Sequence, residues 1–215
     1  MNDSILNFVE DAKKRLLQLQ AEHPEKKEAV QETIRFLDGL TKSLQEGDFE
    51  AILLSALILA FDGLVALEKI EVSVKTYDPD GPSADFADAI AEYEKAMSPP
   101  ENAKDLKTTL SKIGSASVYL MRQLQLFTKK YPAATACDEL ADRLFGLPPK
   151  IFTLIQRLDD DEIAKLTGNL YARSRELHKT ANQLKQLNEV LSTASTAVNV
   201  AIGVLGFLAK FAPLI

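Results

Sequence analysis

The chain has no tryptophan, one cysteine and two histidines, and these absences exclude several kinds of protein. With Cys137 as the single cysteine, no intramolecular disulfide can form, which excludes a small secreted scaffold held by disulfides. Neither histidine lies in a Glu-x-x-His pattern, and no His-Cys or Cys-x-x-Cys grouping occurs, so no ligand set for a di-metal or zinc site is present. We therefore expect no metal site and no cofactor.

Sequence signatures of catalysis are also missing. No glycine-rich phosphate loop and no Gly-x-Ser-x-Gly motif occurs. Asp78 and Asp80 resemble the start of a calcium loop, but Ala87 stands where the loop needs Glu, which favours a simple turn. Cys137 would be activated if it lay near a helix N-terminus capped by Thr135, yet no histidine is close in sequence, and a small buried side chain is the simpler interpretation. We expect no enzymatic activity, no catalytic residue and no small-molecule substrate.

Glycine and proline are scarce, at nine residues each, whereas helix-forming residues are abundant. The segments rich in these two residues divide the chain into stretches of helical length, with breaks at 23–24, 47, 77–83, 98–102, 132 and 146–149. The sequence predicts an all-α fold, an elongated antiparallel bundle of about six to eight helices with a long C-terminal helix. We expect one domain over residues 1–215, with a subdivision near 78–102 as the alternative.

Apolar residues recur on one face of several predicted helices, two of them at the four–three spacing of a helical bundle. They include Val9, Ala12, Leu16 and Leu19, then Ile34, Leu37, Leu40 and Leu44, and then Leu106, Leu110, Ile113, Leu120, Leu124 and Phe127. The stretch 51–61 is apolar on all sides, which indicates a central helix.

Charge is divided unevenly along the chain. Residues 1–100 hold 10 basic and 20 acidic residues, whereas residues 101–215 hold 15 basic and 11 acidic ones. Either the two halves pack with complementary charge, or the basic half faces an anionic partner. No basic cluster is interleaved with aromatic residues, so we expect no nucleic-acid partner.

One apolar position recurs every seven residues near the C-terminus. The series comprises Leu170, Leu177, Leu184, Leu191, Val198 and Leu205. It predicts one helix over 161–211, which would be about 75 Å long at 1.5 Å per residue. The alternative is a break within 192–196 or at Gly203 and Gly206.

The last part of this series is uncharged. The 20 residues between Glu189 and Lys210 are long enough to cross a hydrocarbon core, but their serine, threonine and asparagine content makes direct insertion marginal. Basic residues exceed acidic ones just before this segment. Two interpretations stay open and are compatible: residues 197–212 pack inside the fold against 51–67, or they contact a membrane after release.

The leading functional hypothesis is a non-enzymatic helical protein whose C-terminal helix engages or permeabilises a membrane. The candidate membrane-contacting residues are Val198, Ile202, Leu205, Phe207, Leu208 and Lys210. The alternative is a soluble scaffold or adaptor that binds a partner helix, or itself, through the 163–191 heptad seam, with Leu170, Leu177, Leu184 and Leu191 as its contact residues. The acidic N-terminal segment lacks the pattern of a signal peptide, which favours a cytoplasmic protein that can associate with membranes and self-associate.

Overall fold

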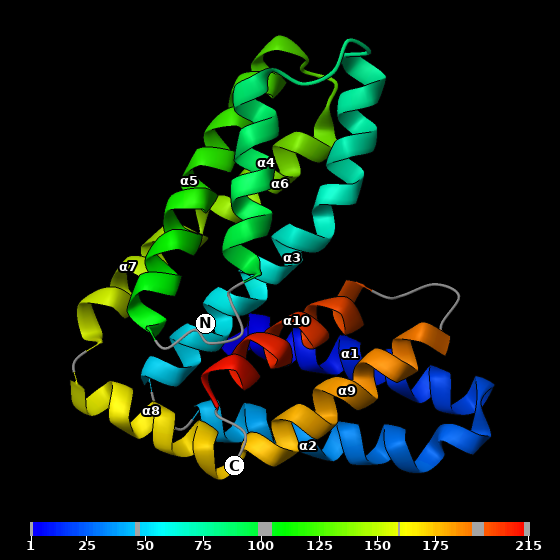
Figure 1. Cartoon of the computed structure of the whole chain (residues 1–215). Helices are drawn as coiled ribbons and strands as arrows, with labels where there is room; N and C mark the ends of the chain where they lie inside the picture. Colours follow the sequence, from blue (N-terminus) through cyan, green and yellow to red (C-terminus); the bar gives the residue numbers. More distant parts are fainter. Residues whose placement is uncertain (1, 46–47, 99–104, 159, 191–195, 213–215) are drawn as a thin grey trace. The chain divides into compact units, whose positions relative to one another are not determined.

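The computed structural model describes residues 2–45, 48–98, 105–158, 160–190 and 196–212 (Figure 1). Throughout this part of the chain the backbone is helical apart from short connections, and it contains no β-strand. The prediction of an all-α fold is confirmed.

The helix boundaries follow the breaks in the sequence. The elements are α1 (Asn2–Glu22), the 3₁₀ turn η1 (Pro24–Lys26), α2 (Lys27–Gln45), α3 (Asp48–Tyr77), α4 (Ala84–Met97), α5 (Leu106–Lys130), α6 (Thr135–Phe145), α7 (Leu147–Arg157), α8 (Asp160–Ala172), α9 (Ser174–Val190) and α10 (Thr196–Phe211). Proline lies at the start of η1 because its missing N–H costs nothing in a first turn. In the turn before α4, Gly81 has a φ of 94°, a backbone conformation that glycine adopts readily.

Local side-chain caps fix two helix starts. Ser83 Oγ accepts a hydrogen bond from the Phe86 N–H at the start of α4, and the Asp105 carboxylate accepts one from the Thr108 N–H at the start of α5. The cap predicted at Thr135 is wrong. Helix α6 begins at that residue, so the capping position falls on Ala134, whose side chain has no hydrogen-bonding group.

Contacts among the helices fall into two compact units. The terminal unit comprises residues 1–58 and 157–215, and the central unit comprises residues 59–156. The boundaries lie inside α3 and at the end of α7, and neither lies within 78–102. The expectation of a single domain over residues 1–215 stays a prediction.

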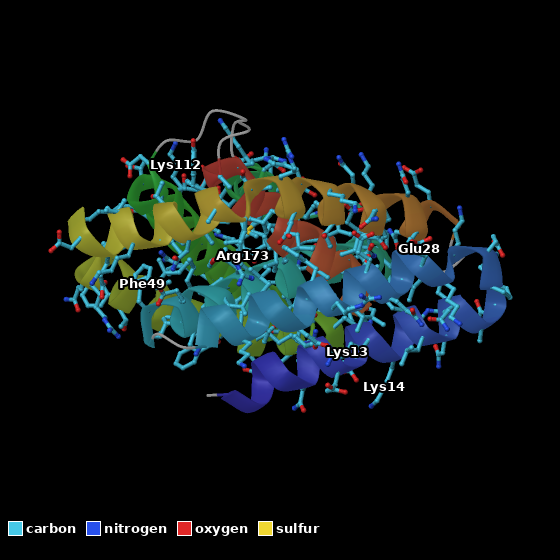
Figure 2. The ribbon with its side chains drawn as sticks, turned by 90° about the horizontal axis from the view of Figure 1, so that it is seen from below. Lys13, Lys14, Glu28, Phe49, Lys112 and Arg173 are labelled. Carbon is cyan, nitrogen blue, oxygen red and sulfur yellow. The ribbon has the colours of Figure 1, made fainter. Side chains whose placement is uncertain are left out.

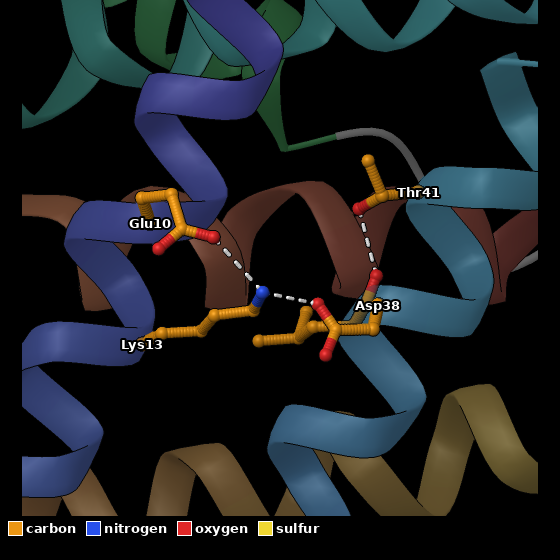
Figure 3. A network of polar contacts seen from close by, with 5 residues as sticks. Glu10, Lys13, Asp38 and Thr41 are labelled. Atoms are coloured by element: carbon orange, nitrogen blue, oxygen red, sulfur yellow. Dashed lines mark hydrogen bonds and ion pairs between the residues drawn. The ribbon is translucent and has the colours of Figure 1, made fainter.

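In the terminal unit, α1 and α2 form a helical hairpin that is closed by the His23–Pro24 turn. Helix α10 packs against α9, α1 and α8, and α2 packs against α9. Figure 3 shows how polar contacts join the hairpin: Lys13 on α1 pairs with Glu10 and with Asp38 on α2. One turn further along α2, the Thr41 hydroxyl donates to the Leu37 carbonyl at 2.7 Å. The apolar spacing predicted for α1 lies in the core, with Val9, Ala12, Leu16 and Leu19 all buried.

In the central unit, α5 packs against both α4 and α6. All the α5 positions selected by apolar spacing are buried: Leu106, Leu110, Ile113, Leu120, Leu124 and Phe127. The second part of α3 is joined to α4 by the buried Tyr93 hydroxyl, which donates to the Ala60 carbonyl at 2.7 Å. Gly63 lies beside this contact, where an added Cβ would be 2.7 Å from the Tyr93 oxygen. A side chain at position 63 would therefore force the Tyr93 hydroxyl or Leu144 to shift.

The single long helix predicted over 161–211 is wrong. The chain forms α8, α9 and α10 instead, with a turn at Arg173, and α10 folds back to pack against α9 (Figure 1). Of the breaks considered, Gly203 and Gly206 lie inside α10, and residues 192–195 lie outside the described residues. Folding back buries the apolar seam within the chain, whereas an overhanging helix would leave it in water.

The uneven charge is partly neutralised within each unit. Lys130 pairs with Asp78 at 3.1 Å, Arg143 pairs with Asp62 at 3.0 Å, and Lys179 pairs with Glu32. Each pair joins a base from the second half of the chain to an acid from the first half. These pairs favour the interpretation of complementary halves.

Candidate functional site

The candidate membrane-contacting residues lie on α10, and most of them are buried. Val198, Leu205, Phe207 and Leu208 are buried, whereas Ile202 and Lys210 are half-buried. The covering helices within the terminal unit are α9, α1 and α8, and the expected packing of 197–212 against 51–67 stays a prediction. Half of the residues of α10, including most of these candidates, are thus buried in this structure.

Two hydrogen bonds from α9 side chains reach α10 or the residue after it. Asn188 Nδ2 donates to Asn199 Oδ1 at 3.0 Å. His178 Nε2 lies 3.2 Å from the carbonyl oxygen of Ala212. These contacts hold both ends of α10 to α9.

The heptad seam proposed for a partner helix is not a free surface. Leu170, Leu177 and Leu184 are buried, with exposed fractions of 3%, 0% and 0%, and Leu191 lies outside the described residues. The scaffold alternative requires these leucines to be half exposed in the monomer. The seam is instead covered inside the terminal unit, where α9 packs against α10, α2 and α8.

Helix α3 has a property that the sequence analysis missed. Among the described residues, it is the one helix long and apolar enough to cross a membrane, with an 18-residue stretch of mean hydropathy 2.1. Half of that stretch is buried, as in the core helix of a soluble protein. Length and composition alone therefore do not make α3 a membrane span.

A groove of about 540 Å³ lies between α2 and the α8–α9 junction, within the terminal unit. Helix α2 contributes Glu32, Arg35, Phe36 and Gly39. The junction and the start of α9 contribute Arg173, Arg175, Glu176, Lys179 and Thr180. Arg173 lies on the side of the α8–α9 segment that faces α2 (Figure 2). We call this feature the arginine groove.

Positive charge exceeds negative charge in the arginine groove. Four cationic side chains line it against two carboxylates. Glu32 is already paired with Lys179, and it also accepts a hydrogen bond from Gln183 at 3.0 Å. Lys179 lowers the pKa of Glu32 below its usual value, with smaller contributions from Gln183 and the charge of Arg35. Within the described residues, Arg173 and Arg175 form no ion pair.

From the sequence alone, the basic residues of the α8–α9 junction were recognised only as an excess of basic over acidic residues before the C-terminal apolar segment. Their convergence with Arg35 depends on the turn at Arg173 and on the packing of α9 against α2. No spacing rule connects positions 35 and 173, so this site was missed.

The remaining reactive side chains form no recognisable centre. Cys137 is fully buried, burial raises the pKa of its thiol, and its nearest polar partner is the Ser73 hydroxyl at 3.9 Å. His23 lies at a helix end beside Glu25, at 3.2 Å, and His178 contacts the end of α10. In the part of the chain that the structure describes, no group of three or more His, Cys, Asp or Glu could hold a metal ion.

No protein-family model, no curated protein and no solved structure matches this chain.

Proposed function

We propose that this protein, without enzymatic activity, engages and permeabilises membranes through α10, which stays covered until it is released. The observation that carries the proposal is the composition of α10 combined with its burial. Its one charged residue is Lys210, and eight of its 16 residues are buried. Release would expose a helix that is apolar on nearly all sides, and a membrane takes up such a surface more readily than water does.

Release of α10 would require its contacts with α9, α1 and α8 to break. In this proposal, the helices of the terminal unit form an antiparallel bundle around α10, and the protein is cytoplasmic until it meets a membrane. Released copies would associate with one another on the membrane, because each exposes the same apolar surface.

Helix α3 is a weaker candidate for the same role. Its apolar stretch contains Glu50 and Asp62, and Asp62 is paired with Arg143. The buried hydrogen bond from Tyr93 to Ala60 also holds α3 in the central unit. Inserting α3 would require breaking these contacts and taking two carboxylates toward the lipid.

A site-specific fluorescent label tests the proposal. Gly206 on α10 and Gly168 on α8 both have open space where a Cβ would be added, so Gly206→Cys and Gly168→Cys are matched substitutions. Each is made in a Cys137→Ala background and labelled with an environment-sensitive dye. With liposomes that hold an entrapped dye, we expect leakage, together with a blue shift and quenching by lipid-borne quenchers at position 206 but not at position 168.

Absence of leakage, or an equal response at the two positions, would contradict the proposal. The two labels lie on different helices, and neither site has a heavy atom within 4 Å of an added Cβ. Non-specific adsorption of the protein to lipid would therefore shift the emission of both labels.

A further inference from the structure

Arginine is concentrated in the lining of the arginine groove. Three of the chain's seven arginines line it, although lysine outnumbers arginine among the 25 basic residues. A guanidinium presents a planar set of donors that matches two oxygens of a phosphate or carboxylate at once. A gathering of arginines around one hollow is therefore more specific than a general basic surface.

The charges in the groove are incompletely neutralised. Glu32 is occupied by Lys179 and Gln183, which leaves Glu176 as the one remaining carboxylate of the lining. The same groove is lined by Arg35, Arg173 and Arg175, none of which forms an ion pair in the described part of the chain. The excess positive charge is local, since the whole chain carries a net charge of −6.

The volume and lining of the arginine groove limit the kinds of ligand that it can bind. A volume of about 540 Å³ is within the range of small-molecule sites and exceeds what a single inorganic ion fills. Phe36 supplies an apolar wall, and Gly39 leaves open space on the α2 side because an added Cβ would meet nothing within 4 Å. The groove thus accommodates an anionic group attached to a small organic body.

We infer that the arginine groove binds a phosphate monoester. A monoester carries close to two negative charges and three free oxygens, which satisfies Arg173 and Arg175 together, with Arg35 facing from α2. The same group occurs on soluble metabolites and on the headgroup of phosphatidic acid, so either source fits the groove. Binding does not depend on release of α10, because the groove lies between α2 and the α8–α9 junction.

The test uses the full chain and two probes. Glycerol 3-phosphate is titrated by calorimetry, and phosphatidylcholine vesicles containing phosphatidic acid are tested by co-sedimentation. Vesicles containing phosphatidylglycerol, a phosphate diester, serve as the comparison. We expect saturable binding of at least one monoester probe and weaker binding of the diester vesicles.

Three variants locate the site. Arg173→Ala/Arg175→Ala removes the unpaired charges, and Gly39→Glu places a carboxylate in the open part of the groove; we expect each to weaken binding about tenfold or more. Lys112→Ala/Arg122→Ala removes two exposed positive charges from α5 and leaves binding unchanged (Lys112 is labelled in Figure 2). Far-UV circular dichroism verifies that each variant is folded.

Each outcome has a defined meaning. Binding of glycerol 3-phosphate that the groove variants weaken supports the inference with a soluble ligand. Binding of phosphatidic acid vesicles alone, with the same dependence on the variants, supports it with a lipid ligand. No binding of either probe, equal binding of the two kinds of vesicle, or equal weakening by the α5 variant overturns it.

Discussion

At the scale of single residues, two helical glycines differ in what surrounds them. Gly39 has open space at the position of a Cβ, whereas a Cβ at Gly63 would lie 2.7 Å from the Tyr93 oxygen and 3.1 Å from Leu144 Cδ2. We expect Gly39→Ala to stabilise the protein by about 0.5–1 kcal/mol, because alanine restricts the unfolded chain. Gly63→Ala should destabilise it by about 1–3 kcal/mol through overpacking. Urea unfolding of both variants measures the difference, and equal effects at the two sites would be inconsistent with this packing.

The nearest atom to the Gly63 site is a hydroxyl oxygen that can be removed. Tyr93→Phe loses the buried hydrogen bond to Ala60, at a cost of about 1 kcal/mol. It also removes the atom that an alanine at position 63 would strike. We therefore expect the double variant Gly63→Ala/Tyr93→Phe to be more stable than the sum of the single variants predicts, as a double-mutant cycle would measure. Additive effects would mean that Leu144 dominates the clash.

Burial, with a smaller contribution from the charge of Asp62, raises the pKa of Tyr93 far above its usual range, so this hydroxyl stays protonated.

Glu32 makes the stability of the terminal unit depend on pH in the acidic range. Its pKa is lowered from the usual 4.5, chiefly by the hydrogen bond from Lys179. A carboxyl group whose pKa is lower in the folded state stabilises the fold above its unfolded pKa, and this stabilisation is lost as pH falls through the folded pKa. We expect the wild type to melt slightly above Glu32→Gln at neutral pH, and the difference to shrink as the pH falls below 4.5 and through the lowered pKa of Glu32. A difference that is constant from neutral to acidic pH would exclude ionisation of Glu32 as its cause.

At the scale of helices, the contact between α9 and α10 controls the proposed release. Asn188 and Asn199 face each other across this contact, with a hydrogen bond of 3.0 Å. Asn188→Cys/Asn199→Cys, in a Cys137→Ala background, allows a short bifunctional maleimide to join the two helices. We expect crosslinking to abolish leakage from liposomes, and the uncrosslinked variant to retain it. Persistent leakage from fully crosslinked protein would show that α10 need not leave α9.

Helices were more predictable from the sequence than their arrangement. The proline and glycine breaks and the four–three spacing located the helices and the buried face of α5, because these signals are local. The seven-residue repeat from Leu170 to Leu205 was misleading, since two packed helices can share one register across a chain reversal. The sequence offered a break within 192–196 as the alternative, but the choice between one helix and a break depends on contacts between α9 and α10. The arginine groove, which depends on α2 meeting α9, was missed for the same reason.

At the scale of the whole chain, we expect the two units to differ in how a single substitution changes their local stability. Leu184 is fully buried in the terminal unit, so Leu184→Ala should cost about 2–5 kcal/mol, whereas Leu17→Ala, at a residue 53% exposed, should cost little. We expect hydrogen exchange in Leu184→Ala to accelerate in residues 1–58 and 157–215 and to stay slow in α4, α5 and α6. Acceleration in those three helices as well would mean that the units unfold together.

The length of α10 has a consequence for the lipid itself. Its 16 residues form a helix about 24 Å long, which falls short of the hydrocarbon thickness of about 30 Å. A released α10 would therefore wedge into one leaflet and enlarge its area relative to the other. Such an imbalance is relieved where the outer leaflet is already stretched, so leakage should be faster from small, strongly curved vesicles than from large ones of the same composition. Size-fractionated liposomes at equal lipid concentration measure this preference, and equal rates would indicate a complete span built with residues beyond α10.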